Sequence, residues 1–242
     1  MPLPKVSTPV FELNLVSSNK KVKYRPFLVK EEKALLMAME TNEEKTILNT
    51  LKSVMNACIL TRGIKIDDLP SFDLEFIFLN IRGKSVGETV DLLITCNDDG
   101  ETQVPLSIAM SDIKLNIPDN HSDTIDLEDD LHIKMKYPSF SQFAENNFFP
   151  SKETEKDVIE KAFESIVECI DQVYNKEEAW SASDCTKKEL IEFIEQFSSL
   201  QFTKIEEFFS TMPKLSYKGT VVNPKTKKKN DVEIEGLSNF FA

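Results

Sequence analysis

The sequence predicts an α+β protein, in which antiparallel β-hairpins and a small sheet combine with amphipathic helices. Two observations predict this class. Several strand-like segments follow one another in pairs, with turn-forming residues between them, and other segments repeat apolar residues every three or four positions. A third observation excludes a Rossmann-type sheet, because strands and helices do not alternate as βαβ units require.

The first hairpin is expected near the N-terminus, from strands at residues 10–15 and 21–29. Apolar and polar residues alternate in both segments, and residues 17–20 have turn composition. Pro26 places the second strand near a sheet edge, because proline cannot donate to a ladder of hydrogen bonds.

Two helices are expected to follow this hairpin. The first, residues 30–40, has Leu35, Leu36 and Met39 on one side. Thr41 and Glu44 then have the spacing of a capping box at the start of the second helix. That helix has a strict apolar stripe and is expected to end near Gly63. The stripe consists of Ile47, Leu48, Leu51, Val54, Met55, Cys58 and Ile59.

A third helix is expected to begin at Pro70 and Ser71. Asp73 in its first turn and Arg82 in its last favour a helix, since these charges complement the helix dipole. A strand is the alternative, because apolar residues also alternate along residues 72–78.

A β section begins after Gly87. Residues 90–96 and 102–108 flank an Asn-Asp-Asp-Gly turn, which is a strong hairpin signal. Residues 113–117 and 132–135 resemble further strands, and the acidic stretch 118–130 between them is expected to be irregular.

The chain from Ser139 onward is expected to be helical, until Pro213 ends the last helix. Its capping-box pairs are Ser139 with Gln142, Thr186 with Glu189, and Thr203 with Glu206. One helix is expected to carry a broad apolar face from Val158 to Val173.

A final hairpin is expected from residues 215–222 and 231–235, joined by the polar loop 223–230. We therefore divide the chain into two regions. Residues 1–136 hold the N-terminal hairpin, helices and small antiparallel sheet. Residues 137–242 form a helical region that ends in a hairpin and an aromatic tail.

Composition excludes several classes of protein. The 242 residues are 40% hydrophobic and 29% charged, and the formal net charge is −12, which is unfavourable for general nucleic-acid binding. The N-terminus lacks the apolar run of a signal peptide, and no segment has the length of a membrane span. The four cysteines lack metal-binding spacing. Without a secretion signal or a membrane span, we expect a reducing cytoplasm, no disulfides and no membrane partner.

No catalytic motif is present in the sequence. His121 and His132, the two histidines, lack metal-ligand spacing. An acidic run from Asp126 to Asp130 hints at a calcium loop, but Leu131 occupies the position that needs glycine. No glycine-rich phosphate loop exists. We expect no catalytic residue, cofactor or metal.

The candidate sites are therefore surfaces for binding other proteins. Charge is uneven: residues 1–30 and 213–236 are net basic, and residues 119–180 are strongly acidic. The Phe pair at the end either packs against its own core or docks on another subunit, and the lysine loop is an exposed hairpin tip or a nucleic-acid contact. The candidate interface residues are Lys20, Lys21, Lys23, Lys225, Lys227, Lys228, Lys229, Phe240 and Phe241.

Three parts of the sequence together resemble a known family: residues 23–33, residues 72–88 and the ending 235–241. They are similar to the baseplate hub proteins of T-even-like contractile-tailed bacteriophages, which include hub subunits and hub assembly factors. The resemblance implies a non-enzymatic role and other hub or tail proteins as partners. It implies a location in the virion baseplate, or in the host cytoplasm during assembly. Homo-oligomer formation is left open, and the alternative function is an acidic, host-directed regulatory binding protein.

The resemblance also implies that some relatives carry cysteine pairs at such hairpin turns, as in a small zinc knuckle. Here Cys96 stands alone in the first turn, and residues 223–230 contain no cysteine. A four-cysteine zinc site is therefore not available, and we expect ordinary turns to hold both hairpins.

Overall fold

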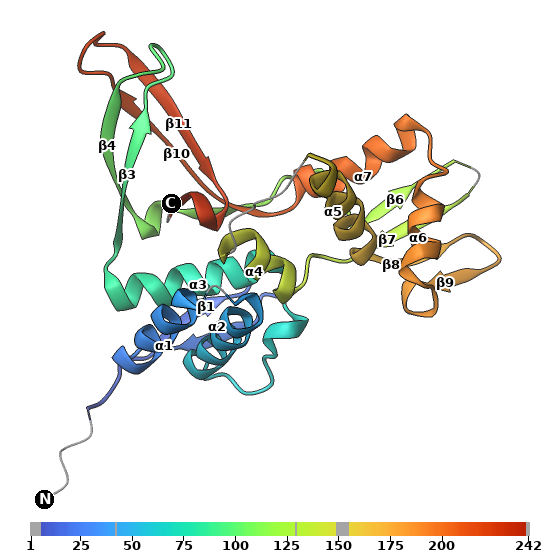
Figure 1. Cartoon of the computed structure of the whole chain (residues 1–242), viewed down its shortest axis with the longest axis horizontal. Coiled ribbons are helices and arrows are strands. Elements are labelled where there is room, and N and C mark those ends of the chain that lie inside the picture. Colours follow the sequence, from blue (N-terminus) through green and yellow to red (C-terminus); the bar gives the residue numbers. More distant parts are fainter. Residues whose placement is uncertain (1–5, 42, 129, 149–154, 241–242) are drawn as a thin grey trace, which may run out of the picture. The chain divides into compact units, whose positions relative to one another are not determined.

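The fold is described from a computed structural model of the chain, in which residues 6–41, 43–128, 130–148 and 155–240 are described (Figure 1). The helices are α1 (Val29–Glu40), α2 (Glu44–Cys58), α3 (Ser71–Val86), α4 (Phe140–Phe148), α5 (Glu155–Glu168), α6 (Lys187–Ile194) and α7 (Ser199–Thr211). The first strands are β1 (Phe11–Asn14), β2 (Lys21–Tyr24), β3 (Thr89–Thr95), β4 (Gln103–Ala109), β5 (Lys114–Asn116) and β6 (Thr124–Asp126). The others are β7 (His132–Met135), β8 (Ile170–Tyr174), β9 (Ala179–Ser181), β10 (Lys214–Val222) and β11 (Lys229–Glu235).

The strands form small antiparallel sheets, so the predicted α+β class is confirmed. The sheets are the β1–β2 and β3–β4 hairpins, a three-stranded sheet in the order β11-β10-β5 and a four-stranded sheet in the order β6-β7-β8-β9. The three predicted hairpins are all present. The strand β6 lies in the acidic stretch that was expected to be irregular, and β9 was not predicted.

The chain divides into two units. Unit 1 consists of Met1–Asn116, Phe143–Phe149 and Lys214–Ala242, and unit 2 consists of Ile117–Gln142 and Pro150–Pro213. This division differs from the predicted boundary between residues 136 and 137. The reason is that β5 pairs with β10, which joins the C-terminal hairpin to the first part of the chain, while β7 pairs with β8 in unit 2.

The helices α2 and α3 supply much of the core of unit 1. The predicted stripe of α2 is buried at Ile47, Leu51, Val54, Met55 and Cys58. The helix ends at Cys58 rather than near Gly63, because the next residues pair with β2. The Leu60 backbone N–H donates to the Lys23 carbonyl at 2.8 Å, and this extended pairing stops the helix.

The segment 71–86 is a helix, which confirms the predicted helix and excludes the alternative strand. Its buried Asp73 accepts a hydrogen bond from the Val16 backbone N–H at 2.9 Å and another from the Ser17 hydroxyl. The carboxylate thereby holds the turn between β1 and β2 against α3.

Two of the predicted helix starts are wrong, and two are supported by hydrogen bonds. Thr41 ends α1, because its hydroxyl donates to the Ala38 carbonyl at 2.7 Å, and α2 begins after Glu43. The helix α7 begins four residues before Thr203, at a capping box made by Ser198 and Gln201. The Thr186–Glu189 box is confirmed. At Ser139, the backbone N–H donates to Gln142 Oε1 at 2.9 Å, as a capping box requires.

Unit 2 packs α5, α6 and α7 with the four-stranded sheet around one apolar core. The predicted apolar helix face continued to Val173, but α5 ends at Glu168. Ile170 and Val173 lie on β8, where they pair with Met135 and Ile133 of β7. A short apolar run with both spacings fits a helix or a buried strand, and the pairing with β7 decides for the strand.

The helix α1 turns a different side inward from the one predicted. Its buried residues are Glu31 and Ala38, while Leu36 and Met39 are exposed. The cause is Arg25, whose guanidinium donates to both Glu31 carboxylate oxygens at 2.9 and 2.8 Å. The Glu31 carboxylate also accepts from the Leu28 backbone N–H at 2.6 Å, at the start of the helix. These hydrogen bonds, Arg25 first, lower the pKa of Glu31 below its usual range.

We expect Glu31→Gln to lower the free energy of unfolding by about 2–3 kcal/mol, because it leaves the half-buried Arg25 guanidinium without its ionised partner. Urea unfolding followed by circular dichroism measures this. Glu32→Gln on the exposed side of α1 is the matched control and should change stability by less than about 0.5 kcal/mol. Equal effects of the two substitutions would show that the buried ion pair does not orient α1.

Candidate protein-interaction site

Two hairpins of unit 1, β3–β4 and β10–β11, form an arm with both turns at the same end (Figure 1). In the first hairpin, Thr95 and Gln103 are the last paired residues before the turn. In the second, Val222 and Lys229 have the same role. The arm therefore brings together two turns that are far apart in the sequence, residues 96–102 and residues 223–228, the second taken here with Lys229 and Asn230 at the start of β11.

The two turns have similar backbone hydrogen bonding. In the first turn, the Cys96 carbonyl accepts from the Gly100 N–H at 2.9 Å. In the second, the Asn223 carbonyl accepts from the Lys227 N–H at 2.9 Å. Gly100 and Lys227, the fifth residue of each turn, both have positive φ, +69° and +62°. Glycine adopts this conformation without steric cost, whereas lysine needs contacts elsewhere that hold the turn.

Those contacts are side-chain hydrogen bonds between the turns. The Asn223 amide nitrogen donates to Asp98 Oδ1 and to Asp99 Oδ2, each at 2.9 Å. The Asp98 backbone N–H donates to Asn230 Oδ1 at 2.9 Å, and the Thr226 hydroxyl donates to the other oxygen of Asp98. We call these five residues, Asp98, Asp99, Asn223, Thr226 and Asn230, the turn cluster. Asn223 and Asn230 are buried, so their amides are held in place by these bonds.

The hydrogen bonds of the turn cluster favour the ionised form of both aspartates. Bonds from Thr226 and Asn223 lower the pKa of Asp98. Bonds from the Thr102 hydroxyl and backbone, together with Asn223, hold the pKa of Asp99 far below its usual range. Both carboxylates are therefore charged acceptors at neutral pH, and hydrogen bonds to charged acceptors are the stronger kind.

The part of the chain that the structure describes offers no set of ligands for a metal ion. No group of three or more His, Cys, Asp or Glu side chains is placed to hold a metal ion among those residues. Burial raises the pKa of the Cys96 thiol, which disfavours the thiolate that a metal would need. The two turns are held by hydrogen bonds within each turn and between them.

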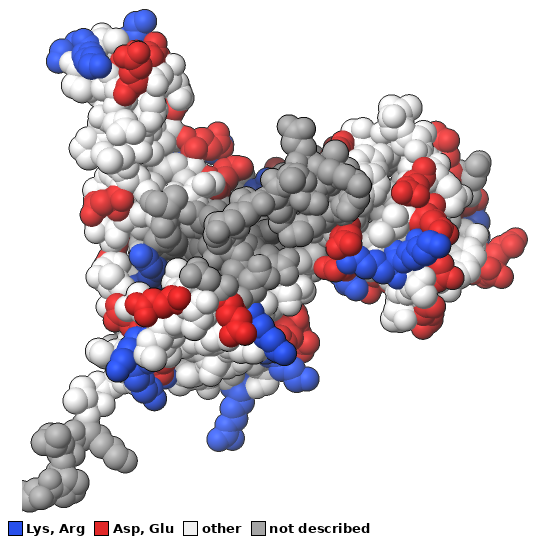
Figure 2. Space-filling view, in the orientation of Figure 1, with Lys and Arg blue, Asp and Glu red and all other residues white. Residues whose placement is uncertain are grey.

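The four lysines of the second turn are all exposed, and Figure 2 shows basic and acidic side chains together at the tip of the arm. The backbone that carries them is fixed by Asn223. Its Oδ1 accepts from the Lys225 N–H at 2.8 Å, and its amide nitrogen donates to Asp98. Lys225, Lys227, Lys228 and Lys229 thus project from an ordered loop, which suits a surface for protein binding.

The predicted lysines of the first hairpin have a different setting. Lys21 and Lys23 lie 3.3 and 3.5 Å from the Glu12 carboxylate, so part of their charge is offset within the hairpin. Lys20 is exposed, and its carbonyl accepts from the Leu15 N–H. These residues belong to β1–β2 and its turn, separate from the turn cluster.

The described part of the aromatic tail is buried. Phe240 is 0% exposed and Leu237 is 1% exposed, so this part of the tail packs against its own unit. The burial of Phe240 corrects its selection as an interface residue, since a fully buried ring is not available to a partner. Phe241 lies outside the described residues.

Both histidines have local partners. His121 contacts the Thr211 and Tyr137 hydroxyls at 3.0 Å each, and burial lowers its pKa. His132 Nδ1 lies 2.6 Å from Asp126 Oδ1 on the neighbouring strand β6. These contacts account for both rings as parts of unit 2.

Comparison with known protein families gives a match over nearly the whole chain. A family model described as T4 bacteriophage base plate protein matches residues 8–242. No curated protein matches the chain, and neither does any solved structure. In the described part of the chain, no helix combines the length and the apolar character needed to cross a membrane.

We expect Asn223→Ala to speed amide exchange at Gly100 and Lys227 by at least about tenfold, because it removes two bonds to ionised carboxylates. Hydrogen exchange read by NMR measures both amides. Asn97→Ala, at an exposed position of the first turn, is the control and should leave both amides unchanged. Unchanged exchange in Asn223→Ala would mean that the turns do not depend on one another.

We expect Phe240→Ala to lower the free energy of unfolding by about 3–5 kcal/mol, because it leaves a cavity where a fully buried ring was. Denaturant unfolding measures the loss. Leu36→Ala, on the exposed side of α1, should cost much less. A small effect of Phe240→Ala would return this residue to the candidate interface.

Proposed function

Because the chain belongs to the family of T4 bacteriophage base plate proteins, we propose that it is a non-enzymatic structural or assembly protein of the baseplate hub. Its partners are other hub or tail proteins of a contractile tail. It acts in the virion baseplate, or in the host cytoplasm while the hub is being assembled.

The observation that carries this proposal is the turn cluster. Its hydrogen bonds join two turns and hold four exposed lysines on an ordered loop. A surface that is already ordered loses little conformational entropy when a partner binds, which suits a protein that acts through interfaces. Acidic surfaces of neighbouring hub or tail proteins are the matching partners, since opposite charges orient the encounter.

The test is affinity purification of the tagged chain from phage-infected cells, followed by mass spectrometry. We expect hub or tail proteins to co-purify. A variant with Lys225, Lys227, Lys228 and Lys229 all changed to Gln should recover at least about tenfold less of them at an unchanged melting temperature. A variant with Lys20, Lys21 and Lys23 changed to Gln, assayed in the same way, measures how much the lysines of the first hairpin contribute to partner recovery.

Recovery of host proteins alone would contradict the proposal and favour a host-directed regulatory protein. Mass spectrometry of purified virions completes the experiment, because a permanent hub subunit is present in the particle and an assembly factor is not.

A further inference from the structure

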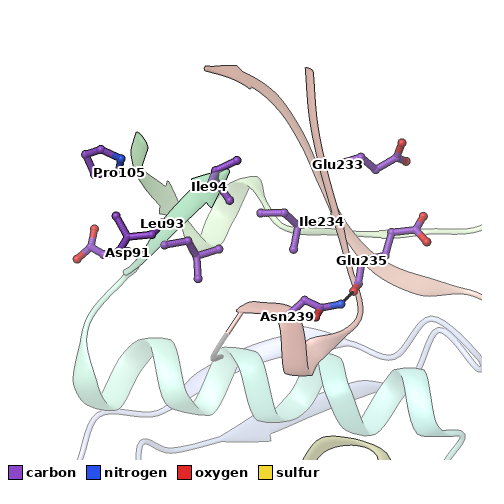
Figure 3. Close-up of a pocket in the computed structure, with 9 residues that line it drawn as sticks. Asp91, Leu93, Ile94, Pro105, Glu233, Ile234, Glu235 and Asn239 are labelled. Carbon is purple, nitrogen blue, oxygen red and sulfur yellow. Dashed lines mark hydrogen bonds between the residues drawn. The ribbon is translucent and has the colours of Figure 1, made fainter. Parts of the chain in front are cut away.

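A cleft of about 600 Å³ lies between the two hairpins of the arm (Figure 3). Its walls include consecutive residues of β3, from Asp91 to Ile94, and consecutive residues of β11, from Glu233 to Glu235. Successive side chains of a strand point to opposite faces of its sheet. A cleft bordered by consecutive residues of β3 and of β11 includes the edges of these strands, where backbone groups are accessible, and Pro105 of β4 also borders it.

The register of β3 shows which backbone groups face its open edge. The Cys96 N–H donates to the Thr102 carbonyl at 2.8 Å, and the Met110 N–H donates to the Glu88 carbonyl at 2.8 Å. Hydrogen-bonded pairs alternate in an antiparallel ladder, so Leu92 and Ile94 face β4. Asp91 and Leu93 consequently direct their N–H and C=O groups away from β4. Among the described strands, β3 pairs with β4 alone.

Two other edges of the arm's hairpins, those of β4 and β11, carry features that discourage pairing. On β4, Pro105 stands opposite Leu93, at a position whose N–H would face outward, and proline has none. On β11, the outward-facing residues Glu233 and Glu235 are charged, and the Asn239 amide donates to the outward carbonyl of Glu235 at 2.8 Å (Figure 3). Prolines and charges on edge strands are the usual protection against unwanted strand addition.

The edge of β3 is less protected, because Asp91 is its one charged residue and the strand contains no proline. Leu93, at its centre, is 67% exposed, so the edge presents an apolar side chain to solvent. A second apolar side chain, Ile94, borders the same cleft from β3, and Ile234 borders it from β11. An incoming strand would therefore gain both main-chain hydrogen bonds and apolar contact.

The charges around the cleft indicate the chemistry of that strand. Asp91, Glu233 and Glu235 all border it. Lys218 lies 2.6 Å from Glu233 and Lys214 lies 4.0 Å from Glu235, so part of this charge is offset. Asp91 makes no ion pair with any residue that the structure describes. A strand carrying lysine or arginine fits this rim, whereas a second copy of β3 would bring another Asp91 to it.

We propose that the open edge of β3 is a strand-addition site for an extended segment of a baseplate partner, in which apolar residues alternate with lysine or arginine. The partner adds a strand beside β3, and its basic side chains face Asp91 and the β11 carboxylates. This inference rests on the proposed function for the kind of partner, and on the edge geometry for the mode of binding.

The test is co-expression of the tagged chain with the baseplate hub proteins of the same phage. We expect Leu93→Lys, which adds a charge to the edge, and Leu93→Pro, which removes an outward N–H, each to lower partner recovery at least about tenfold. Leu200→Lys, at an exposed leucine of α7, is the matched control and should recover the partner normally. Circular dichroism checks that each variant is folded.

Hydrogen exchange of the wild-type complex gives a readout that does not depend on substitutions. Binding should newly protect the amides of Asp91 and Leu93, while those of Leu92 and Ile94 are protected already in the free chain. Partner recovery without this pattern would overturn the strand-addition site and leave the proposed function standing. Failure of the wild-type chain to recover any hub protein would overturn both. Protection of Asp91 and Leu93 by self-association alone would identify a second copy as the occupant and contradict the basic strand.

Discussion

The hydrogen bonds from Asn223 to Asp98 and Asp99 are the interaction on which the arm depends. They join residues that are 125 and 124 positions apart in the sequence, and each uses a charged acceptor. A two-stranded hairpin is only marginally stable in water by itself. Joining two hairpins at their turns gives each hairpin a partner at its tip, next to the buried Cys96 and Val221.

This join also determines what the arm presents to other proteins. The turn cluster orders the backbone of the second turn, which carries the four lysines. It also keeps the β3–β4 and β10–β11 hairpins together on either side of the cleft. Within that arrangement Pro105 and the charged residues of β11 protect two edges, and β3 keeps an exposed Leu93. One polar cluster thus supports both surfaces that we assign to partner binding. Membership of a baseplate family gives these surfaces a context, because baseplate proteins work through contacts with neighbouring proteins.

Local signals in the sequence predicted the hairpins and the α2 stripe, since turn residues and apolar periodicity act over short distances. Non-local contacts caused the errors. The ion pair of Arg25 with Glu31 turns α1 so that Leu36 is exposed, and pairing with β7 makes Ile170 and Val173 part of a strand. The lysines of the second turn were predicted to form a protein-binding surface, but no sequence signal links Asn223 to a turn 125 residues earlier. The Asn-Asp-Asp-Gly turn and the asparagines that begin and end the second loop were the available hints.

The central claim is that an arm held together by its turn cluster binds a baseplate partner at the β3 edge. Cryo-electron microscopy of the chain in complex with the hub proteins tests it most directly. The account predicts a partner strand hydrogen-bonded to Asp91 and Leu93, with basic side chains over Asp91 and the turn cluster intact. A complex in which β3 faces solvent and the partner binds elsewhere would contradict it.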